Sequence, residues 1–511
     1  MKEGTPAGAD SPHKSYSLRP EIPAEMGDGS RLPAALAERV GIDARALAAF
    51  RIYVGLLLCA DLLLRARNLR AFYTDAGVLP RDIHAELYPT LARVSLHTLS
   101  GALWWQALLF VVAFGFALLL TVGYRTRVSA VASWLLLASL QARNDYVLNG
   151  GDTVLLVVLF VALFLPLGRR WSLDARASDG ADATATPAVG FGTAALLSQV
   201  VLIYATNAVF KFRSDAWMAG EAVPQVFQVE RFVVFLGPYI SEFTALLVAI
   251  NWLWVAMLAA SPLLLLARGW LRATLVALYM GAHLAMRLTM DLGLFSEAMV
   301  AGLLVFLPPV VWDRVESAVE PLINGVGDWL DARPGIDAAV QPSRAVLPSG
   351  LRRGAARALP VATALVLVVG LLWQVAAVGV VATPEDAPVD PAEHSWKLFA
   401  PNPPASDGWY VTTAETAAGE EVDVYPHADT GFDPPDDIAD TYPNARWRKY
   451  LTGLQHGSDR RIAAFADYLC RTGAETHGER LTEVEIVFVH ESAHSDERTR
   501  QDLGTYRCRS A

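Results

Sequence analysis

The chain has 511 residues, of which 53% are hydrophobic and only 18% are charged, and this composition is too apolar for an ordinary soluble protein. Its formal net charge is −10 and no Lys/Arg-rich face is evident, which argues against binding to nucleic acid. The three cysteines, Cys59, Cys470 and Cys508, lack the spacing of a zinc site. The composition therefore predicts a membrane protein without a metal site.

Residues 1–44 are polar and rich in proline, with no apolar stretch near Met1 of the kind that a secretory signal peptide contains. We interpret them as a cytoplasmic segment. We expect the first hydrophobic helix of the chain to serve as the insertion signal.

Nine apolar stretches approach the ~20 residues that a helix needs to cross a bilayer. They are residues 46–64, 103–123, 127–142, 152–168, 190–210, 241–267, 271–290, 295–312 and 360–382. The third and fourth stretches are short, so eight or ten spans remain alternatives. With the N-terminus in the cytoplasm, the inner connections hold about twice as many Lys and Arg residues as the outer ones, as the positive-inside rule requires.

These spans predict an all-α membrane helix bundle over residues 45–312, a cytoplasmic connector over residues 313–358 and a final membrane helix over residues 359–382. In the connector, apolar residues recur at helical spacing from Val315 to Leu330, which is typical of an amphipathic helix on the bilayer surface. Nine spans place the remainder of the chain on the extracytoplasmic side, so we expect a cell-membrane protein with multiple passes.

The extracytoplasmic remainder, residues 383–511, shows the patterns of a small α+β domain. Arg460–Leu469 has helical spacing, and residues 426–446 are rich in Asp and Pro and predict a loop. Two further patterns indicate strands: a hairpin of Trp409–Val411 with Val422–Tyr425, and the alternating segment Leu481–Val489. Cys470 and Cys508 form an even pair that we expect to be a disulfide in an oxidising compartment, the alternative being two buried thiols.

The outer connections carry the most distinctive sequence, and the stretch Tyr204–Glu221 is the most distinctive of all. It follows a long apolar run and then gathers Lys211, Asp215 and Trp217 within seven residues. An ionisable residue at membrane depth is costly and usually faces a cavity or the interior of the bundle. We therefore expect this stretch to form one wall of a site on the outer face.

Three local interactions are also expected in these connections. Asp152, after Gly150 and Gly151, is expected to cap a helix, although a capping residue can also face a cavity. Two ion pairs are expected, one between Asp75 and either Arg143 or Arg65, and one between Arg287 and Asp291, which are four residues apart.

Four segments occur in an order that resembles a known family. They are Phe72–Arg81, Leu148–Asp152 with Leu165–Gly168 and Trp171–Asp174, the series Tyr204, Lys211, Trp217 and Gly220, and His283 followed by Leu292–Ser296. Over about residues 45–312 the chain resembles the HTTM family, the membrane domain shared with vitamin K-dependent gamma-carboxylases. Trp396 followed by Phe399-Ala-Pro is similar to the external extension of prokaryotic members.

The resemblance implies an activity and a set of site residues. In gamma-carboxylases a lysine deprotonates the vitamin K hydroquinone, oxygen adds, and the strong base that results removes a γ proton from glutamate before carbon dioxide adds. By resemblance, Lys211 is the base and His283 the second catalytic residue. The quinol, a reduced menaquinone or another vitamin K-type quinol, would contact Asn149, Asp152, Tyr204 and Trp217. The partners would be the lipid bilayer and an extracytoplasmic protein substrate.

A second hypothesis is a non-catalytic membrane protein that binds a lipid or quinone, or a partner through its external domain. It is favoured because Asn149–Asp152 stands where animal carboxylases carry a histidine. The two hypotheses differ in what they predict for Lys211. The enzyme needs a deep cavity lined by Lys211 and His283, whereas the alternative has Lys211 reaching the lipid headgroups or pairing with a carboxylate such as Asp215.

Overall fold

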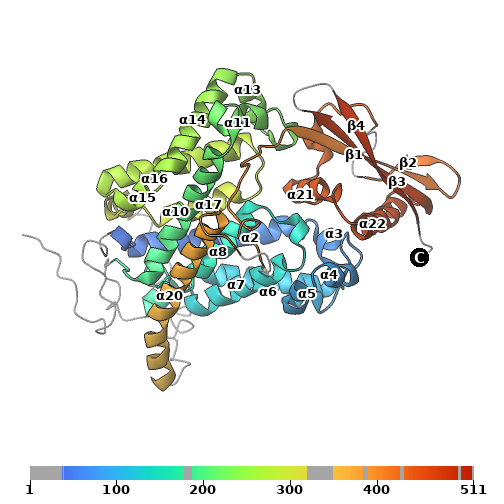
Figure 1. The fold of residues 1–511 in the computed structure, drawn as a ribbon. Helices are drawn as coiled ribbons and strands as arrows, with labels where there is room; N and C mark the ends of the chain where they lie inside the picture. Colours follow the sequence, from blue (N-terminus) through green and yellow to red (C-terminus); the bar gives the residue numbers. More distant parts are fainter. Residues whose placement is uncertain are drawn as a thin grey trace, which may run out of the picture.

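The computed structural model describes residue 37 and residues 39–177, 187–318, 349–383, 389–425, 431–492 and 497–508. Figure 1 shows a body of helices with a small sheet at one side. We call the helical body the bundle and residues 406–508 the C-terminal unit. Most of the predicted N-terminal segment and of the predicted amphipathic connector lies outside the described residues.

A helix occupies each of the nine apolar stretches. The helices are α2 (Ala44–Ala66), α6 (Leu103–Val122), α7 (Thr126–Gln141), α8 (Gly150–Ala162), α10 (Phe191–Phe212), α14 (Thr244–Ala260), α16 (Gly269–Thr289), α17 (Phe295–Leu304) and α20 (Ser349–Ala377). Their apolar faces meet in one large core that includes Phe50, Leu159, Leu196 and Phe306. Within the described residues, the bundle is thus all-helical, as predicted.

Four helices are long and apolar enough to cross a membrane: Ala44–Ala66, Leu103–Val122, Phe191–Phe212 and Ala358–Ala377. A fifth candidate is a pair of short helices, Phe295–Leu304 and Pro309–Ala318, which is bent by 100°. The helices α7, α8 and α14 have 16, 13 and 17 residues. At ~1.5 Å per residue they fall short of the ~30 Å hydrocarbon layer. The described residues therefore support four or five spans, and the predicted count of nine is not confirmed.

Short helices fill the connections between the long ones. They are α3 (Leu69–Tyr73), α4 (Arg81–Leu87), α5 (Pro89–Val94), η1 (Leu96–Thr98), η2 (Asp145–Val147), α9 (Leu173–Ala177), α11 (Asp215–Ala219), α12 (Ala222–Val226), η3 (Glu230–Phe232), α13 (Gly237–Ser241) and α15 (Leu263–Leu266). Both ion pairs expected in the connections are wrong. Asp75 binds Arg81 at 2.8 Å, because Arg81 opens the next helix and its backbone N–H also reaches Asp75.

The expected pair between Arg287 and Asp291 does not form, because α16 ends at Thr289 and Met290 is extended. Asp291 therefore does not lie one turn above Arg287. Instead, Arg287 binds Glu297 at 2.8 Å, and Asp291 binds Arg448 of the C-terminal unit at 2.8 Å.

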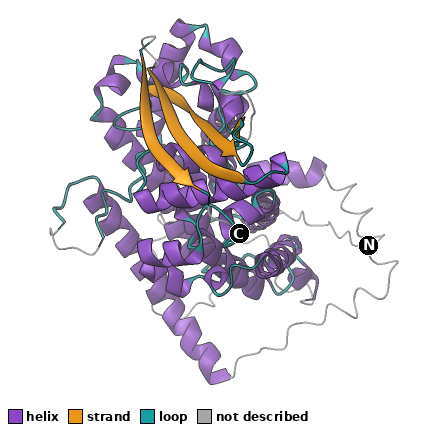
Figure 2. Cartoon of the chain, turned by 90° about the vertical axis from the view of Figure 1, so that its right-hand side faces the viewer, coloured by secondary structure: helices purple, strands orange, loops and turns teal. Residues whose placement is uncertain are grey.

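The C-terminal unit is an antiparallel sheet with two α-helices. The sheet has the order β2-β1-β3-β4, and Figure 2 looks onto it with helices behind. The elements are β1 (Ser406–Thr416), β2 (Glu421–Asp423), η4 (Ile438–Thr441), α21 (Ala445–Leu454), α22 (Asp459–His477), β3 (Leu481–Ser492) and β4 (Arg498–Arg507). The predicted helix and alternating strand are confirmed. A hairpin of β1 with β2 is present, but β2 pairs with Thr413–Glu415, while Trp409–Val411 pairs with β3. The helix α21 and the strand β4 were not predicted.

The predicted disulfide is present: Cys470 of α22 is bonded to Cys508, which follows β4. It ties the last strand to the helix, across 38 residues of sequence. The C-terminal unit also packs against the bundle through aromatic residues. The ring of Trp447 on α21 lies 4.6 Å from that of Phe72, within a core shared by the two parts.

Candidate functional site

Three polar side chains, Tyr204, Asn207 and Lys211, form a stripe along α10. They are separated by three and four residues, so they lie on one face of the helix. All three are buried, and Lys211 exposes only 1% of its surface. The stripe places an amine, an amide and a phenol inside a helix that is long and apolar enough to cross a membrane.

The amine of Lys211 is held by an aromatic ring and a carbonyl group. Its Nζ lies 3.4 Å from the centre of the Trp217 ring and donates a hydrogen bond of 3.1 Å to the carbonyl oxygen of Leu398. Among the described residues, no carboxylate forms an ion pair with Lys211, and Asp215 does not contact it. The side chain therefore neither reaches outward to headgroups nor pairs with a carboxylate, the two arrangements expected for a non-catalytic lysine.

A tight turn after α10 brings Trp217 to Lys211. The helix ends at Phe212, Ser214 is extended, and α11 begins at Asp215, so the chain folds back on itself. Gly220 then ends α11 with φ of 82°, a conformation that glycine adopts without strain. A Cβ atom there would lie 2.9 Å from Nε1 of Trp252, so only glycine allows this approach. Trp217 itself is buried, which excludes it as a lipid-facing anchor.

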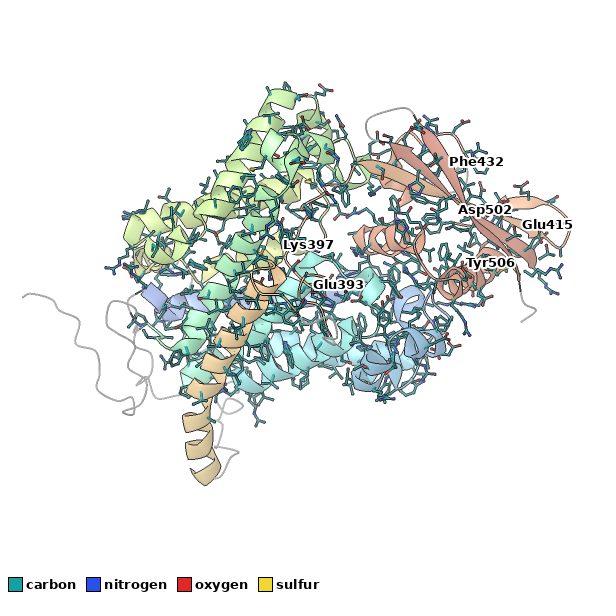
Figure 3. The ribbon with its side chains drawn as sticks, in the orientation of Figure 1. Glu393, Lys397, Glu415, Phe432, Asp502 and Tyr506 are labelled. Carbon is teal, nitrogen blue, oxygen red and sulfur yellow. A yellow bond between two sulfur atoms is a disulfide. The ribbon has the colours of Figure 1, made fainter. Side chains whose placement is uncertain are left out.

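An irregular segment, residues 396–401, lies along the stripe and presents its carbonyl groups to it. Asn207 Nδ2 donates to the carbonyls of Trp396 and Lys397, at 3.1 Å and 2.7 Å. Trp217 Nε1 donates to the carbonyl of Phe399 at 2.8 Å. Figure 3 labels Lys397, which lies where this segment crosses the helices of the bundle, far from the labelled Glu415 and Asp502 of the sheet.

The backbone of the 396–401 segment is strained where it meets Lys211 and Trp217. Leu398 and Phe399 have φ of 36° and 61°, in the left-handed region that residues with a side chain rarely adopt. Such strain persists only where the surroundings enforce it, and it clusters at functional sites. Here it turns two successive carbonyl groups toward Lys211 and Trp217.

A second group of the site lies two turns along α10, roughly 10 Å from Lys211 by helix rise. The hydroxyl of Tyr204 is 2.8 Å from Nε2 of His283 on α16. His283 is fully buried, with the rings of Trp254 and Phe295 at 5.9 Å and 5.7 Å. Its Nδ1 atom has no hydrogen-bond partner in the described part of the chain.

The turn before α8, residues 149–151, reaches the surroundings of Leu398 and Phe295 through Gly150 and Gly151. We call it the Asn149 turn. A Cβ atom on Gly150 would lie 3.0 Å from the Leu398 side chain, and one on Gly151 would lie 2.5 Å from the backbone nitrogen of Phe295. The glycines therefore let the 396–401 segment and the Phe295 turn approach the start of α8. Three of the four distinctive outer segments therefore meet around Leu398 and Phe295: Leu148–Asp152, Tyr204–Gly220 and His283–Ser296.

Asn149 and Asp152 cap α8 together. Asn149 is the N-cap residue, and its side chain accepts from the N–H of Gly151 at 2.9 Å. Asp152 is the third helical residue and accepts from the N–H of Asn149 at 2.8 Å. The pair forms a capping box, so Asp152 helps to cap α8 as expected, although the N-cap residue is Asn149.

The carboxylate of Asp152 belongs to a buried charge network rather than to the Lys211 stripe. Arg65 binds Asp61 at 2.8 Å and also binds Asp152. Arg446 of α21 binds Asp61 at 2.6 Å and Asp152 at 3.0 Å. Two guanidinium groups and two carboxylates thus balance each other in the interior, and the oxygens of Asp152 are occupied by arginines and by the backbone.

Arg446, Arg448 and the 396–401 segment are the parts of this region that the sequence did not reveal. Residues 426–446 were expected to be a loop, and α21 begins at Ala445. Its start signal is nevertheless present, because the side chain of Asn444 accepts from the N–H groups of Arg446 and Trp447. For the 396–401 segment, the signal was the similarity of Trp396 and Phe399-Ala-Pro to an external extension.

Two cavities in the described part of the chain lie elsewhere. One, of about 230 Å³, is at the far ends of α7 and α8, and the other, of about 10 Å³, lies beside His97. Neither is lined by Lys211 or His283. The 396–401 segment fills the space next to Lys211 where the enzyme hypothesis expected a cavity. No cluster of potential metal ligands occurs among the described residues.

The chain was also compared with known proteins. The model of a family described as HTTM domain matches residues 40–312, which is more than half of the chain. This match contains the whole α10 stripe, His283 and the Asn149 turn, and it excludes the 396–401 segment and the C-terminal unit. The comparisons with curated proteins and with solved structures found no significant match.

Proposed function

The chain belongs to the HTTM family, and we propose that it is an integral membrane enzyme in which Lys211 acts as a base on a lipid-soluble quinol. The HTTM domain is associated with vitamin K-dependent carboxylase-type membrane proteins. The quinol would be a reduced menaquinone or another vitamin K-type quinol. The proposed reaction takes place beside α10, on the side of the bundle that meets the C-terminal unit.

The observation that carries the proposal is a buried amine without an anionic partner. A lysine that acts as a base must release its proton before each cycle, and an adjacent carboxylate would oppose this by stabilising the ammonium form. Lys211 has no such partner among the described residues. It has instead a carbonyl oxygen at 3.1 Å and an aromatic ring at 3.4 Å, both of which stabilise the cation that forms once the amine has taken a proton.

The surroundings of His283 suit a flat aromatic ligand with oxygen substituents. Tyr204, Trp254 and Phe295 supply ring surfaces, and the unpartnered Nδ1 of His283 supplies one polar contact. A reduced quinone, when bound, supplies an acidic phenolic hydroxyl group and the reducing equivalents for chemistry with oxygen. The residues of this chain would orient the quinol ring, accept the phenolic proton at Lys211 Nζ and exclude water.

The 396–401 segment must shift for a quinol to reach Lys211. In the structure the Leu398 carbonyl occupies one hydrogen bond of the amine, and the Leu398 side chain lies against the start of α8. The strain at Leu398 and Phe399 lowers the cost of this movement, because displacement of the segment releases it.

A second candidate function is quinone or lipid binding without catalysis, or binding of a partner by the C-terminal unit. One observation favours it: the 396–401 segment already fills the space beside Lys211. In this case Asn207, Lys211 and Trp217 would keep their hydrogen bonds to the carbonyl groups of the 396–401 segment permanently. The quinol chemistry would then not take place.

The decisive experiment supplies purified protein in lipid with reduced menaquinone and oxygen and measures the quinone epoxide by mass spectrometry. We expect epoxide from the wild type and none from Lys211→Ala. Lys397→Ala is the matched control, because Lys397 lies on the adjacent segment with its Nζ 5.8 Å from the Phe210 ring. It should keep the activity. If the wild type forms no epoxide but still binds the quinol, the second candidate function replaces the first.

A further inference from the structure

The cavity of about 230 Å³ at the start of α7 and the end of α8 has two contrasting walls. One wall is apolar and contains Ala130, Ala162 and Leu163. The rim carries the guanidinium groups of Arg127 and Arg169, and both side chains are exposed. The cavity therefore combines cationic donors with an apolar floor, a combination that suits an anionic amphiphile.

The guanidinium groups of Arg127 and Arg169 have no partner within the described residues. No ion pair or hydrogen bond involves either side chain within the described residues. The carboxylate of Asp174, which also lines the cavity, is already occupied, because it accepts from the N–H groups of Arg125 and Thr126 at 2.8 Å and 2.7 Å. Asp174 therefore caps the start of α7, and within the described ranges neither rim arginine has an anionic partner.

A buried arginine fixes the shape of this cavity. Arg51 is fully buried and donates to the carbonyl oxygens of Leu167 and Arg170, each at 3.0 Å. These bonds hold the loop after α8, which supplies Leu165, Gly168 and Arg169 to the cavity. The backbone that lines the cavity is thus held in place before a ligand binds.

The surface next to the cavity is apolar. Val128, Val131 and Leu135 expose 58%, 38% and 53% of their surfaces, and their spacing of three and four residues places them on one face of α7. This face begins beside Arg127 and continues along the helix, as expected for a surface in contact with acyl chains. A soluble phosphate would use the two arginines but not this face.

We propose that the cavity binds the phosphate headgroup of an anionic phospholipid, whose acyl chains follow the exposed face of α7. Arg127 and Arg169 contact the phosphate, and Ala130 and Leu163 contact the glycerol and the first methylene groups. The site is distinct from the Lys211 site, because it lies at the opposite end of α8 from the Asn149 turn. The 13 residues of α8 separate the two ends by roughly 20 Å.

Native mass spectrometry of the detergent-purified protein tests the proposal by titration with phosphatidylglycerol and with phosphatidylcholine of the same acyl chains. The wild type should bind phosphatidylglycerol more tightly than phosphatidylcholine. In Arg127→Ala/Arg169→Ala the affinity for phosphatidylglycerol should fall by roughly thirtyfold, the loss expected for two basic side chains near an anionic lipid. The matched control is Arg67→Ala/Arg93→Ala, which removes two exposed arginines from another part of the chain and should leave the affinity unchanged.

Three results would overturn the proposal: equal binding of the two lipids, equal losses in the two double variants, or displacement of the bound lipid by millimolar inorganic phosphate. The last result would assign the arginines to a soluble anion. A photoreactive phosphatidylglycerol applied to the wild type gives a readout that does not depend on variant folding. Its crosslinks should map to α7 at Val128, Val131 or Leu135, and crosslinks confined to other helices would count against the site.

Discussion

The indole of Trp217 supports both Lys211 and the carbonyl segment that binds it. The face of the ring lies 3.4 Å from Lys211 Nζ, while its Nε1 donates to the carbonyl of Phe399 at 2.8 Å. Phe399 directly follows Leu398, whose carbonyl accepts from Lys211. One side chain thus fixes the distance between the amine and the 396–401 segment, which makes Trp217 the residue that positions the proposed base.

Substitutions of Trp217 should separate its two contacts. Trp217→Phe keeps a ring below the amine but loses the hydrogen bond to Phe399, whereas Trp217→Leu loses both. We expect Trp217→Leu to lower stability more than Trp217→Phe does, because only phenylalanine keeps an aromatic ring against the amine. Thermal unfolding in detergent measures the difference. Equal losses in the two variants would show that the ring face does not stabilise the amine.

Lys211→Met should abolish quinol chemistry without destabilising the protein. Methionine has a similar length and removes a buried amine that has no carboxylate partner, and a buried polar group of this kind is costly to keep out of water. We expect a melting temperature equal to or above that of the wild type, together with complete loss of epoxide formation. A clear drop in melting temperature would mean that the amine is retained for structure rather than for chemistry.

The sequence predicted the helices and the position of Lys211 because both depend on local patterns. An apolar run of about 20 residues is sufficient to predict α10, and the charged residues that interrupt it identify its functional end. The contact between Lys211 and Leu398 spans 187 residues, and no periodicity in the chain encodes it. The same holds for Arg446 and Asp152, which are 294 residues apart.

The missed elements of the C-terminal unit differ in how much signal they carry. In α21, Trp447, Tyr450, Leu451 and Leu454 are spaced as one helical face behind the Asn444 cap, so this helix was predictable. The strand β4 is not predictable in the same way, because Arg498–Arg507 is mostly polar. It lies at the edge of the sheet, where charged side chains are common.

Loss of Arg446 should strongly destabilise the contact between the C-terminal unit and the bundle. Of the cationic partners that the structure describes for Asp61 and Asp152, Arg446→Ala leaves only Arg65, and breaking a buried ion pair in this way costs about 3–5 kcal/mol. Arg460→Ala is the matched control, since its pair with Glu86 also links the two parts but is largely exposed. It should cost at most about 1 kcal/mol. Thermal unfolding of both variants gives the comparison, and similar losses would contradict the prediction.

The disulfide between Cys470 and Cys508 should stabilise the C-terminal unit and report its compartment. We expect Cys508→Ser to lower the stability of this unit by about 2–4 kcal/mol, measured as faster proteolysis of residues 406–508. Alkylation of intact cells before lysis should leave Cys470 unmodified in the wild type, as an extracytoplasmic location requires. Alkylation of Cys470 in fresh cells would place the unit in a reducing compartment. Cys59→Ser serves as the control, because Cys59 is not disulfide-bonded.

His97 should make the protein less stable in acid. It lies outside the predicted spans, and burial lowers its pKa from 6.5 to about 4. Gln106 Nε2 donates to two carbonyl groups, so its Oε1 accepts from His97 Nδ1 at 2.6 Å, and the neutral ring protonated at Nδ1 fits this contact. Since the unfolded chain takes up a proton at higher pH than the folded one, stability should fall as the pH drops from 6.5 to about 4.

The size of this loss follows from the shift in pKa. It amounts to about 3 kcal/mol at most, since each unit of pKa corresponds to about 1.4 kcal/mol. His97→Asn keeps a donor for Gln106 but does not titrate, so its stability should depend less on pH across this interval. Thermal unfolding at a series of pH values compares the two proteins. Parallel profiles would show that His97 is not the group responsible, and His84, whose pKa burial also lowers to about 4, is then the next residue to replace.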